Sequence, residues 1–156
     1  MCGIAGWVDF DADLSRQGGT VESMIAPLAE RGPDAEGVWC SGHCAFGHRR
    51  LAVVDLVGGI QPMVRTRGHR TYVLTYNGQL YNTRELKEEL IARGHVFTTQ
   101  SDTEVLLVAY MEWGPACTER LNGIYAFGVW DEAEHRLFLA RDRFGVKPLF
   151  YKTIGK

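Results

Sequence analysis

The chain begins Met1-Cys2-Gly3-Ile4, and this stretch indicates both fold and chemistry. Removal of Met1 would place a thiol and a free α-amino group on the same residue. An unperturbed α-amino group has a pKa of about 7.7–8.0, so near neutral pH much of it can accept a thiol proton. This is the pattern of an N-terminal nucleophile activated by its own amine. The alternative is a structural cysteine at the start of a first strand, because an isolated motif is a weak indication.

Outward from this start, short apolar or β-branched runs predict strands, while helical spacing and capping residues predict helices. Strands are expected at 4–10, 38–40, 44–54, 71–76, 125–131, 136–141 and 149–153. Helices are expected around 21–28 with Thr20 as cap, from Asn82 to Gly94, and from Ser101 to Gly114. Strands at both ends with helices between them favour an α+β domain with largely antiparallel sheets.

Bulk properties limit the partners. The 156 residues fit one domain, with 46% hydrophobic and 23% charged residues and a formal charge of −2, so neither nucleic acid nor an acidic membrane is expected as partner. No apolar run approaches the roughly 20 residues that span a bilayer, and no signal peptide is visible. Four cysteines without a secretion signal predict free thiols and the cytoplasm. The cluster Cys40, His43, Cys44 and His48 fits no common zinc spacing, so no metal is expected.

Two further groups of residues suggest amide chemistry on an amino acid. The side-chain amide of Asn77 and the N–H of Gly78 can donate to the oxygen of a tetrahedral intermediate, although Asn-Gly alone more often forms a turn. Arg50 can bind a carboxylate, and Asp102, at a helix start, can accept from an ammonium. The alternatives are a surface arginine and a helix-capping aspartate.

In order along the chain, these segments resemble the glutaminase domain of class II glutamine amidotransferases. The resemblance rests on Met1-Cys2-Gly3-Ile4, Arg31-Gly32-Pro33-Asp34, Tyr76-Asn77-Gly78, Ser101-Asp102-Thr103-Glu104 and Ala140-Arg141-Asp142. Further segments are most similar to those of glutamine-dependent asparagine synthetases, namely 50–56, 59–63, 77–82 and 141–149. The resemblance implies an N-terminal-nucleophile hydrolase fold, a four-layer αββα sandwich of two mostly antiparallel sheets.

The resemblance also implies roles for individual residues, with L-glutamine as substrate. Cys2 would attack the side-chain amide, its α-amino group would carry the proton, and Asn77 with the N–H of Gly78 would form the oxyanion hole. Arg50 would bind the substrate α-carboxylate and Asp102 its α-ammonium. The backbone around Leu51 and Val54 would line the pocket. The products would be glutamate and ammonia. Asp142 and Lys147 are expected to be structural or to face a synthetase domain.

Two departures from the family pattern qualify these expectations. Position 79 is Gln, where the family usually has a Glu that helps hold the substrate ammonium, so Gln79 predicts weaker glutamine binding with intact chemistry. The Ser-Gly-Gly phosphate loop of the synthetase domain does not occur in residues 1–156. We therefore expect a single glutaminase domain over 1–156, truncated at its C-terminal end, with no cofactor of its own.

Because the Ser-Gly-Gly phosphate loop does not occur in residues 1–156, ATP, Mg²⁺ and aspartate chemistry is expected in a C-terminal synthetase domain or a separate synthetase subunit. A missing final strand would also favour association, so a homodimer is one expected assembly. If Met1 is retained, the nitrogen of Cys2 is an amide and the chain should be inactive. Two alternatives stay open at this point: a glutaminase serving another acceptor, and a non-catalytic module that binds glutamine.

Overall fold

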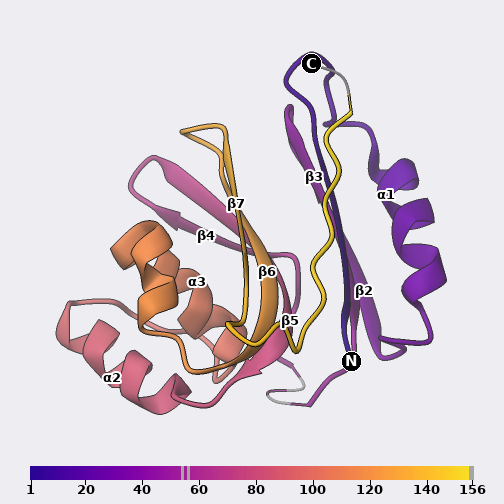
Figure 1. Ribbon diagram of the computed structural model, residues 1–156. Coiled ribbons are helices and arrows are strands. Elements are labelled where there is room, and N and C mark those ends of the chain that lie inside the picture. The colour runs from indigo at the N-terminus through magenta and orange to yellow at the C-terminus, as the bar shows by residue number, and fades with distance from the viewer. Residues whose placement is uncertain (54, 56, 155–156) are drawn as a thin grey trace.

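The computed structural model describes residues 1–53, 55 and 57–154 (Figure 1). Its strands are β1 (Gly3–Val8), β2 (Ala35–Cys40), β3 (Cys44–Arg50), β4 (Met63–Arg67), β5 (Arg70–Leu80), β6 (Gly123–Asp131) and β7 (Arg136–Arg141). Its α-helices are α1 (Gly18–Ile25), α2 (Thr83–Ala92) and α3 (Asp102–Trp113), and short 3₁₀ helices cover Ala26–Leu28 and Gly114–Glu119.

The strands form two antiparallel sheets that pack face to face. The first has the order β1-β3-β2 and the second the order β4-β5-β6-β7. Helix α1 covers the outer face of the first sheet, while α2 and α3 cover the outer face of the second (Figure 1). The result is the predicted four-layer αββα sandwich.

Apolar side chains fill each of the three spaces between these layers. Phe46 of the first sheet meets Val73 and Trp130 of the second between the sheets. Successive residues of a strand point to opposite faces, so the neighbours of Val73 point the other way. Leu74 and Tyr76 accordingly join the larger core under α2 and α3. This alternation lets β5 contribute to two cores at once.

The end of β5 corrects one expectation from the sequence. Asn77 and Gly78 do not form a turn: they lie inside β5, opposite Ala126 and Tyr125 of β6. The glycine is needed for close approach, because a Cβ at Gly78 would lie 2.3 Å from the carbonyl oxygen of Ile124. The pair is therefore held on a paired strand rather than on a loop.

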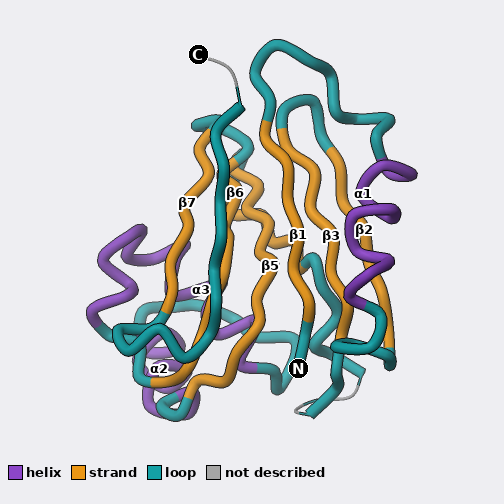
Figure 2. The backbone as a smooth tube through the Cα atoms, turned by 45° about the vertical axis from the view of Figure 1, so that its right-hand side comes forward, coloured by secondary structure: helices purple, strands orange, loops and turns teal. Residues whose placement is uncertain are grey.

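Other element boundaries also differ from expectation. Helix α1 begins at Gly18, so Thr20 lies within the helix and is not its cap. Strand β3 ends at Arg50, and β4 was not expected. The segment 149–153 is not a strand, because no described strand pairs with it; Figure 2 draws it as a loop running lengthwise past the sheets.

Candidate active site

One pocket of about 150 Å³ brings together the site residues expected from the sequence, apart from Val54, which lies outside the described residues. The two residues before β1, the end of β3, the end of β5 and the start of α3 each contribute to it. Its lining includes Met1, Cys2, Arg50, Leu51, Val53, Gly59, Gln61, Tyr76, Asn77, Gly78, Gln79, Asp102, Thr103, Ile124 and Lys147.

Cys2 is half-buried immediately before β1, where its sulfur lies against the backbone that follows β3. The N–H of Leu51 donates to Sγ at 3.4 Å, and the carbonyl oxygen of Leu51 lies 3.7 Å from Sγ. The terminal amine of Met1 donates to the carbonyl oxygen of Arg31 at 3.0 Å. While Met1 is attached, the Cys2 nitrogen belongs to a peptide bond, so removal of Met1 is required to create an amine base beside Sγ.

No histidine is among the described residues that line this pocket, so a cysteine–histidine pair does not account for it. The nearby His48 is fully buried between the sheets, where its Nδ1 lies 3.2 Å from Oγ1 of Thr75. Burial, with a smaller contribution from Arg50, lowers the pKa of His48 to about 3. His48 is therefore a neutral core residue and a weak base, poorly suited to take the proton of Cys2.

Asn77 and Gly78 present donors from a rigid strand. The side chain of Asn77 is 6% exposed, and within the described part of the chain its amide makes no hydrogen bond. The residue lines the pocket, so these free amide donors suit a group that arrives with a ligand. Pairing of β5 with β6 fixes the direction of these donors before any ligand binds.

Arg50 also lines the pocket and is held by the loop that follows β3. Its Nη2 donates to the carbonyl oxygen of Asp55 at 2.5 Å. A Cβ at Gly59 would lie 2.6 Å from the same nitrogen, so glycine is required for this close packing. Arg50 is 7% exposed, and these contacts hold its guanidinium in the pocket wall.

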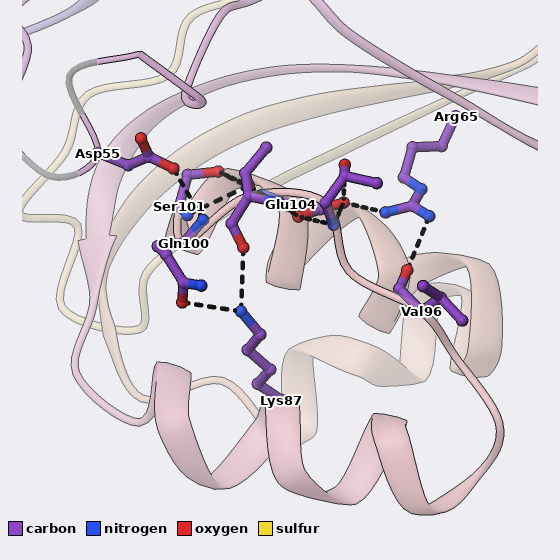
Figure 3. Close-up of polar contacts among 9 residues, drawn as sticks. Asp55, Arg65, Lys87, Val96, Gln100, Ser101 and Glu104 are labelled. Atoms are coloured by element: carbon purple, nitrogen blue, oxygen red, sulfur yellow. Dashed lines mark hydrogen bonds and ion pairs between the residues drawn. The ribbon is translucent and has the colours of Figure 1, made fainter.

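The Asp55 carboxylate connects this loop to the segment before α3 (Figure 3). One oxygen accepts from the N–H of Gly58 at 2.7 Å and the other from the N–H of Gln100 at 2.8 Å. These bonds lower the pKa of Asp55. The segment that carries Arg50 and the segment that leads to Asp102 are thus joined by one side chain.

Asp102 opens α3, and its carboxylate is oriented by two donors. The hydroxyl of Tyr76 donates at 2.8 Å and the N–H of Leu80 at 3.1 Å, both to the same oxygen. The Ser101 hydroxyl accepts from the N–H of Glu104 at 3.3 Å, as the capping pattern in the sequence predicts. Burial and the neighbouring Asp102 charge raise the pKa of Tyr76 well above its usual value, so the phenol stays a donor.

Glu104 anchors the segment before α3 through hydrogen bonds (Figure 3). Its carboxylate accepts from the backbone N–H and the hydroxyl of both Thr98 and Thr99 and pairs with Arg65. Burial alone would raise the pKa of Glu104, but the hydrogen bonds outweigh it and lower the pKa. Lys87 adds a bond from its Nζ to the carbonyl oxygen of Thr99 at 3.0 Å.

Replacing this anchor should destabilise the fold. We expect Glu104→Gln to lower the free energy of unfolding at pH 7 by about 1.5–3 kcal/mol, the range for a hydrogen bond to a charged group. Because folding lowers the pKa of Glu104, its stabilisation is present at neutral pH and is lost as pH falls through the folded pKa. Urea unfolding of both proteins from pH 7 down to pH 3 should therefore show a shrinking difference.

The matched control for that experiment is Glu88→Gln, which removes an exposed ion pair with Arg84 one helical turn away. We expect a change below about 0.5 kcal/mol from the control. Equal losses from the two variants, or a difference that stays constant with pH, would contradict the role given to Glu104.

Among the pocket residues that the sequence did not single out, Gln61, Tyr76 and Lys147 carry polar groups that bear on the site. Gln61 is buried; its Oε1 accepts from the N–H of Tyr76 at 2.6 Å and its Nε2 lies 3.5 Å from Oγ1 of Thr103. Tyr76 orients Asp102. Lys147 was expected to be structural or to face another domain, but it lines the pocket. Gln61 and Lys147 lie in the segments 59–63 and 141–149 that carry the family resemblance, and this was the available signal.

Within the described residues, no group of three or more His, Cys, Asp or Glu side chains is placed to hold a metal ion. The described helices also include none with the length and apolar character needed to cross a bilayer.

Comparison with known proteins identifies the family. The model of the glutamine amidotransferase domain matches residues 1–156. The chain is 56% identical over 155 residues to asparagine synthetase [glutamine-hydrolyzing] 3 of Bacillus subtilis, covering 99% of this chain and 25% of that protein. It is 34% identical over 150 residues to asparagine synthetase B [glutamine-hydrolyzing] of Escherichia coli, covering 96% of this chain and 26% of that protein.

Solved structures share the fold. Glutamine phosphoribosylpyrophosphate amidotransferase from B. subtilis matches 95% of this chain and 38% of its own, with a TM-score of 0.73 and 23% identity. The allosteric regulatory enzyme of purine biosynthesis matches 70% of this chain and 25% of its own, with a TM-score of 0.57 and 31% identity. The chain spans about a quarter of the length of the curated relatives it matches. By the match over its whole length, the chain belongs to the glutamine amidotransferase domain family.

Proposed function

We propose that this chain hydrolyses L-glutamine to glutamate and ammonia, with Cys2 as nucleophile. The observation that carries the proposal is the meeting of three kinds of group in one pocket: a thiol, unsatisfied amide donors, and an arginine opposite a carboxylate. Arg50 would bind the substrate α-carboxylate in a charge-assisted contact, and Asp102 would accept from the α-ammonium. The side chain of the bound amino acid would then extend toward Cys2.

The reaction follows from these positions. The free α-amine of trimmed Cys2 takes the thiol proton, and the thiolate attacks the side-chain amide carbon of glutamine. Asn77 and the N–H of Gly78 stabilise the oxyanion of the tetrahedral intermediate. The intermediate collapses, the carbon–nitrogen bond breaks, and the proton passes from the amine to the departing ammonia. Water then attacks the thioester, releasing glutamate and restoring the thiol.

Gln79 gives a testable difference in binding. Its side chain is exposed at the pocket edge, so a carboxylate there would add an attraction for the substrate ammonium. We expect Gln79→Glu to lower KM for glutamine by up to about fivefold, equivalent to about 1 kcal/mol for an exposed ion pair, and to leave kcat unchanged. Steady-state glutamate release measures both constants.

Gln17→Glu is the matched control for that variant, because it adds the same charge before α1, away from the pocket. Its KM should equal that of the parent chain. A KM that is unchanged or higher in Gln79→Glu would count against a weakened ammonium site.

The ammonia acceptor belongs to the larger assembly. Since the relatives named above are glutamine-hydrolysing asparagine synthetases, we infer a synthetase domain or subunit that uses ATP and Mg²⁺ to convert aspartate to asparagine. All four cysteines are free, which fits a reducing compartment such as the cytoplasm. Two alternatives must be distinguished from this proposal by experiment. One is a glutaminase that serves a different ammonia acceptor, and the other is a module that binds glutamine without hydrolysing it.

The decisive test combines mass and activity. Intact mass spectrometry reports whether Met1 has been removed, and glutamate release is then measured on the trimmed chain with free glutamine. A glutamine-mimicking diazoketone should label Cys2 in the same material. Turnover with labelling supports the proposal. Trimmed, folded protein that binds glutamine yet neither releases glutamate nor reacts with the diazoketone would identify a binding module instead.

A further inference from the structure

Lys147 is a buried cation that the proposed reaction does not use. It follows β7, lines the pocket together with Cys2, and is 7% exposed. Its Nζ lies 2.6 Å from the sulfur of Met1. A lysine this buried is uncommon without a charged partner, so its placement calls for an explanation.

The turn that carries Lys147 is firmly built. The Asp142 carboxylate accepts from the N–H of Val146 at 2.8 Å, of Lys147 at 2.9 Å and of Tyr125 at 3.3 Å. The N–H of Asp142 donates in return to the carbonyl oxygen of Tyr125 at 2.8 Å. Tyr125 is the β6 partner of Gly78. Lys147 is thus fixed to the strand that supports the proposed oxyanion donors.

Removal of Met1 changes what this ammonium faces. The sulfur that it contacts belongs to the residue whose carbonyl is bonded to the Cys2 nitrogen. Cleavage of that peptide bond takes away the sulfur and turns the Cys2 nitrogen, which belongs to the same pocket, into a free α-amine. The chain at Lys147 stays held by Asp142, so the buried charge then shares one pocket with the new amine and the thiol.

We propose that Lys147 is a positioning residue whose ammonium keeps the Cys2 α-amine unprotonated and stabilises the Cys2 thiolate. This inference rests on the proposed function. A nearby like charge disfavours the protonated amine, and an opposite charge favours the thiolate. Both effects raise the fraction of chains ready to attack glutamine at neutral pH.

The other charged groups around the pocket are accounted for by their own partners. Arg50 from β3 and Asp102 from α3 would be neutralised by the two charged ends of bound glutamine. Asp102 is also bonded by the hydroxyl of Tyr76 from β5. The Asp142 carboxylate is occupied by backbone N–H groups. Of the described charged residues that line the pocket, Lys147 is then the one without a proposed partner. Without glutamine, Arg50 and Asp102 act equally on the parent and on a Lys147 variant, so comparing the two isolates the effect of Lys147.

The test is the pH dependence of Cys2 alkylation by iodoacetamide, measured on trimmed chain without glutamine. We expect Lys147→Met to move the midpoint of the alkylation profile upward by about one pH unit. Glutamine turnover at pH 7 should fall about tenfold, with KM unchanged and recovery at higher pH. Lys147→Arg, which keeps the charge, should retain a midpoint close to that of the parent.

Lys152→Met is the control, because it removes the same charge from an exposed position. An unchanged midpoint in Lys147→Met would overturn the inference, even if turnover fell, since a purely structural role predicts lower activity without a pH shift. If Lys147→Met does not fold, Lys147→Gln is measured by the same criterion. Alkylation needs no glutamine turnover, so failure of the proposed hydrolysis would be seen separately, in the parent chain.

Discussion

Cys2→Ala is expected to eliminate glutamate release while glutamine still binds. Removing a covalent nucleophile from a hydrolase lowers kcat on the order of 10⁶-fold, because no other group in the pocket can form the acyl intermediate. The fold should survive, since the hydrogen bonds that Sγ makes with described residues go to the backbone of Leu51 and Cys2 is half-buried. Glutamate release gives the loss of turnover, and calorimetric titration with glutamine gives the retained binding.

Cys40→Ala is the matched control, because Cys40 lies on β2 and does not line the pocket. Burial raises the pKa of the Cys40 thiol, so it is also a poor nucleophile. Its variant should keep full turnover. Turnover that persists in Cys2→Ala would remove the basis of the proposed mechanism.

Asn77→Ala should produce the second largest effect, a loss of about 10²–10³ in kcat with little change in KM. The amide lies on β5 in the pocket lining and, among the described residues, makes no hydrogen bond, so its donors are available to the oxyanion that forms only during reaction. An interaction made in the transition state and absent from the bound substrate changes kcat rather than KM. Steady-state kinetics on the trimmed chain separates the two constants.

Asn122→Ala removes the same amide from an exposed position outside the pocket and should leave both constants unchanged. Thermal unfolding of Asn77→Ala shows whether the fold is intact. A stable Asn77→Ala protein with nearly normal kcat would mean that Asn77 is not an oxyanion donor. A large rise in KM alone would assign it to substrate binding.

Local sequence patterns predicted the helices better than the strand ends. The Ser101 cap and the hairpin of β6 and β7 are confirmed, because both depend on residues close together in the chain. The prediction of a turn at Asn77-Gly78 was wrong, because pairing of this segment with β6 overrode a strong local turn preference. Only the fold could show that Gly78 is required by contact with Ile124.

The candidate site was also predicted in part from the sequence and completed by the structure. Family motifs brought Cys2, Arg50 and Asp102 into one expected pocket, and the structure places them there. They did not reveal Lys147, which reaches the pocket through the turn after β7. The pair of Arg65 with Glu104 was also missed, since a charge on an unexpected strand gives no sign of its distant partner.

The bridge made by Asp55 has a consequence for substrate length. Because its carboxylate ties the Arg50 loop to the segment before Asp102, the separation of the two charge-binding groups is fixed. In the proposed binding mode, an amino acid held by both groups has its α-carbon at a fixed distance from Sγ, and the length of its side chain decides whether the amide reaches the sulfur. Asparagine, shorter by one methylene, would hold its amide short of the sulfur. In this binding mode, the spacing of Arg50 and Asp102 that Asp55 maintains would select glutamine over asparagine.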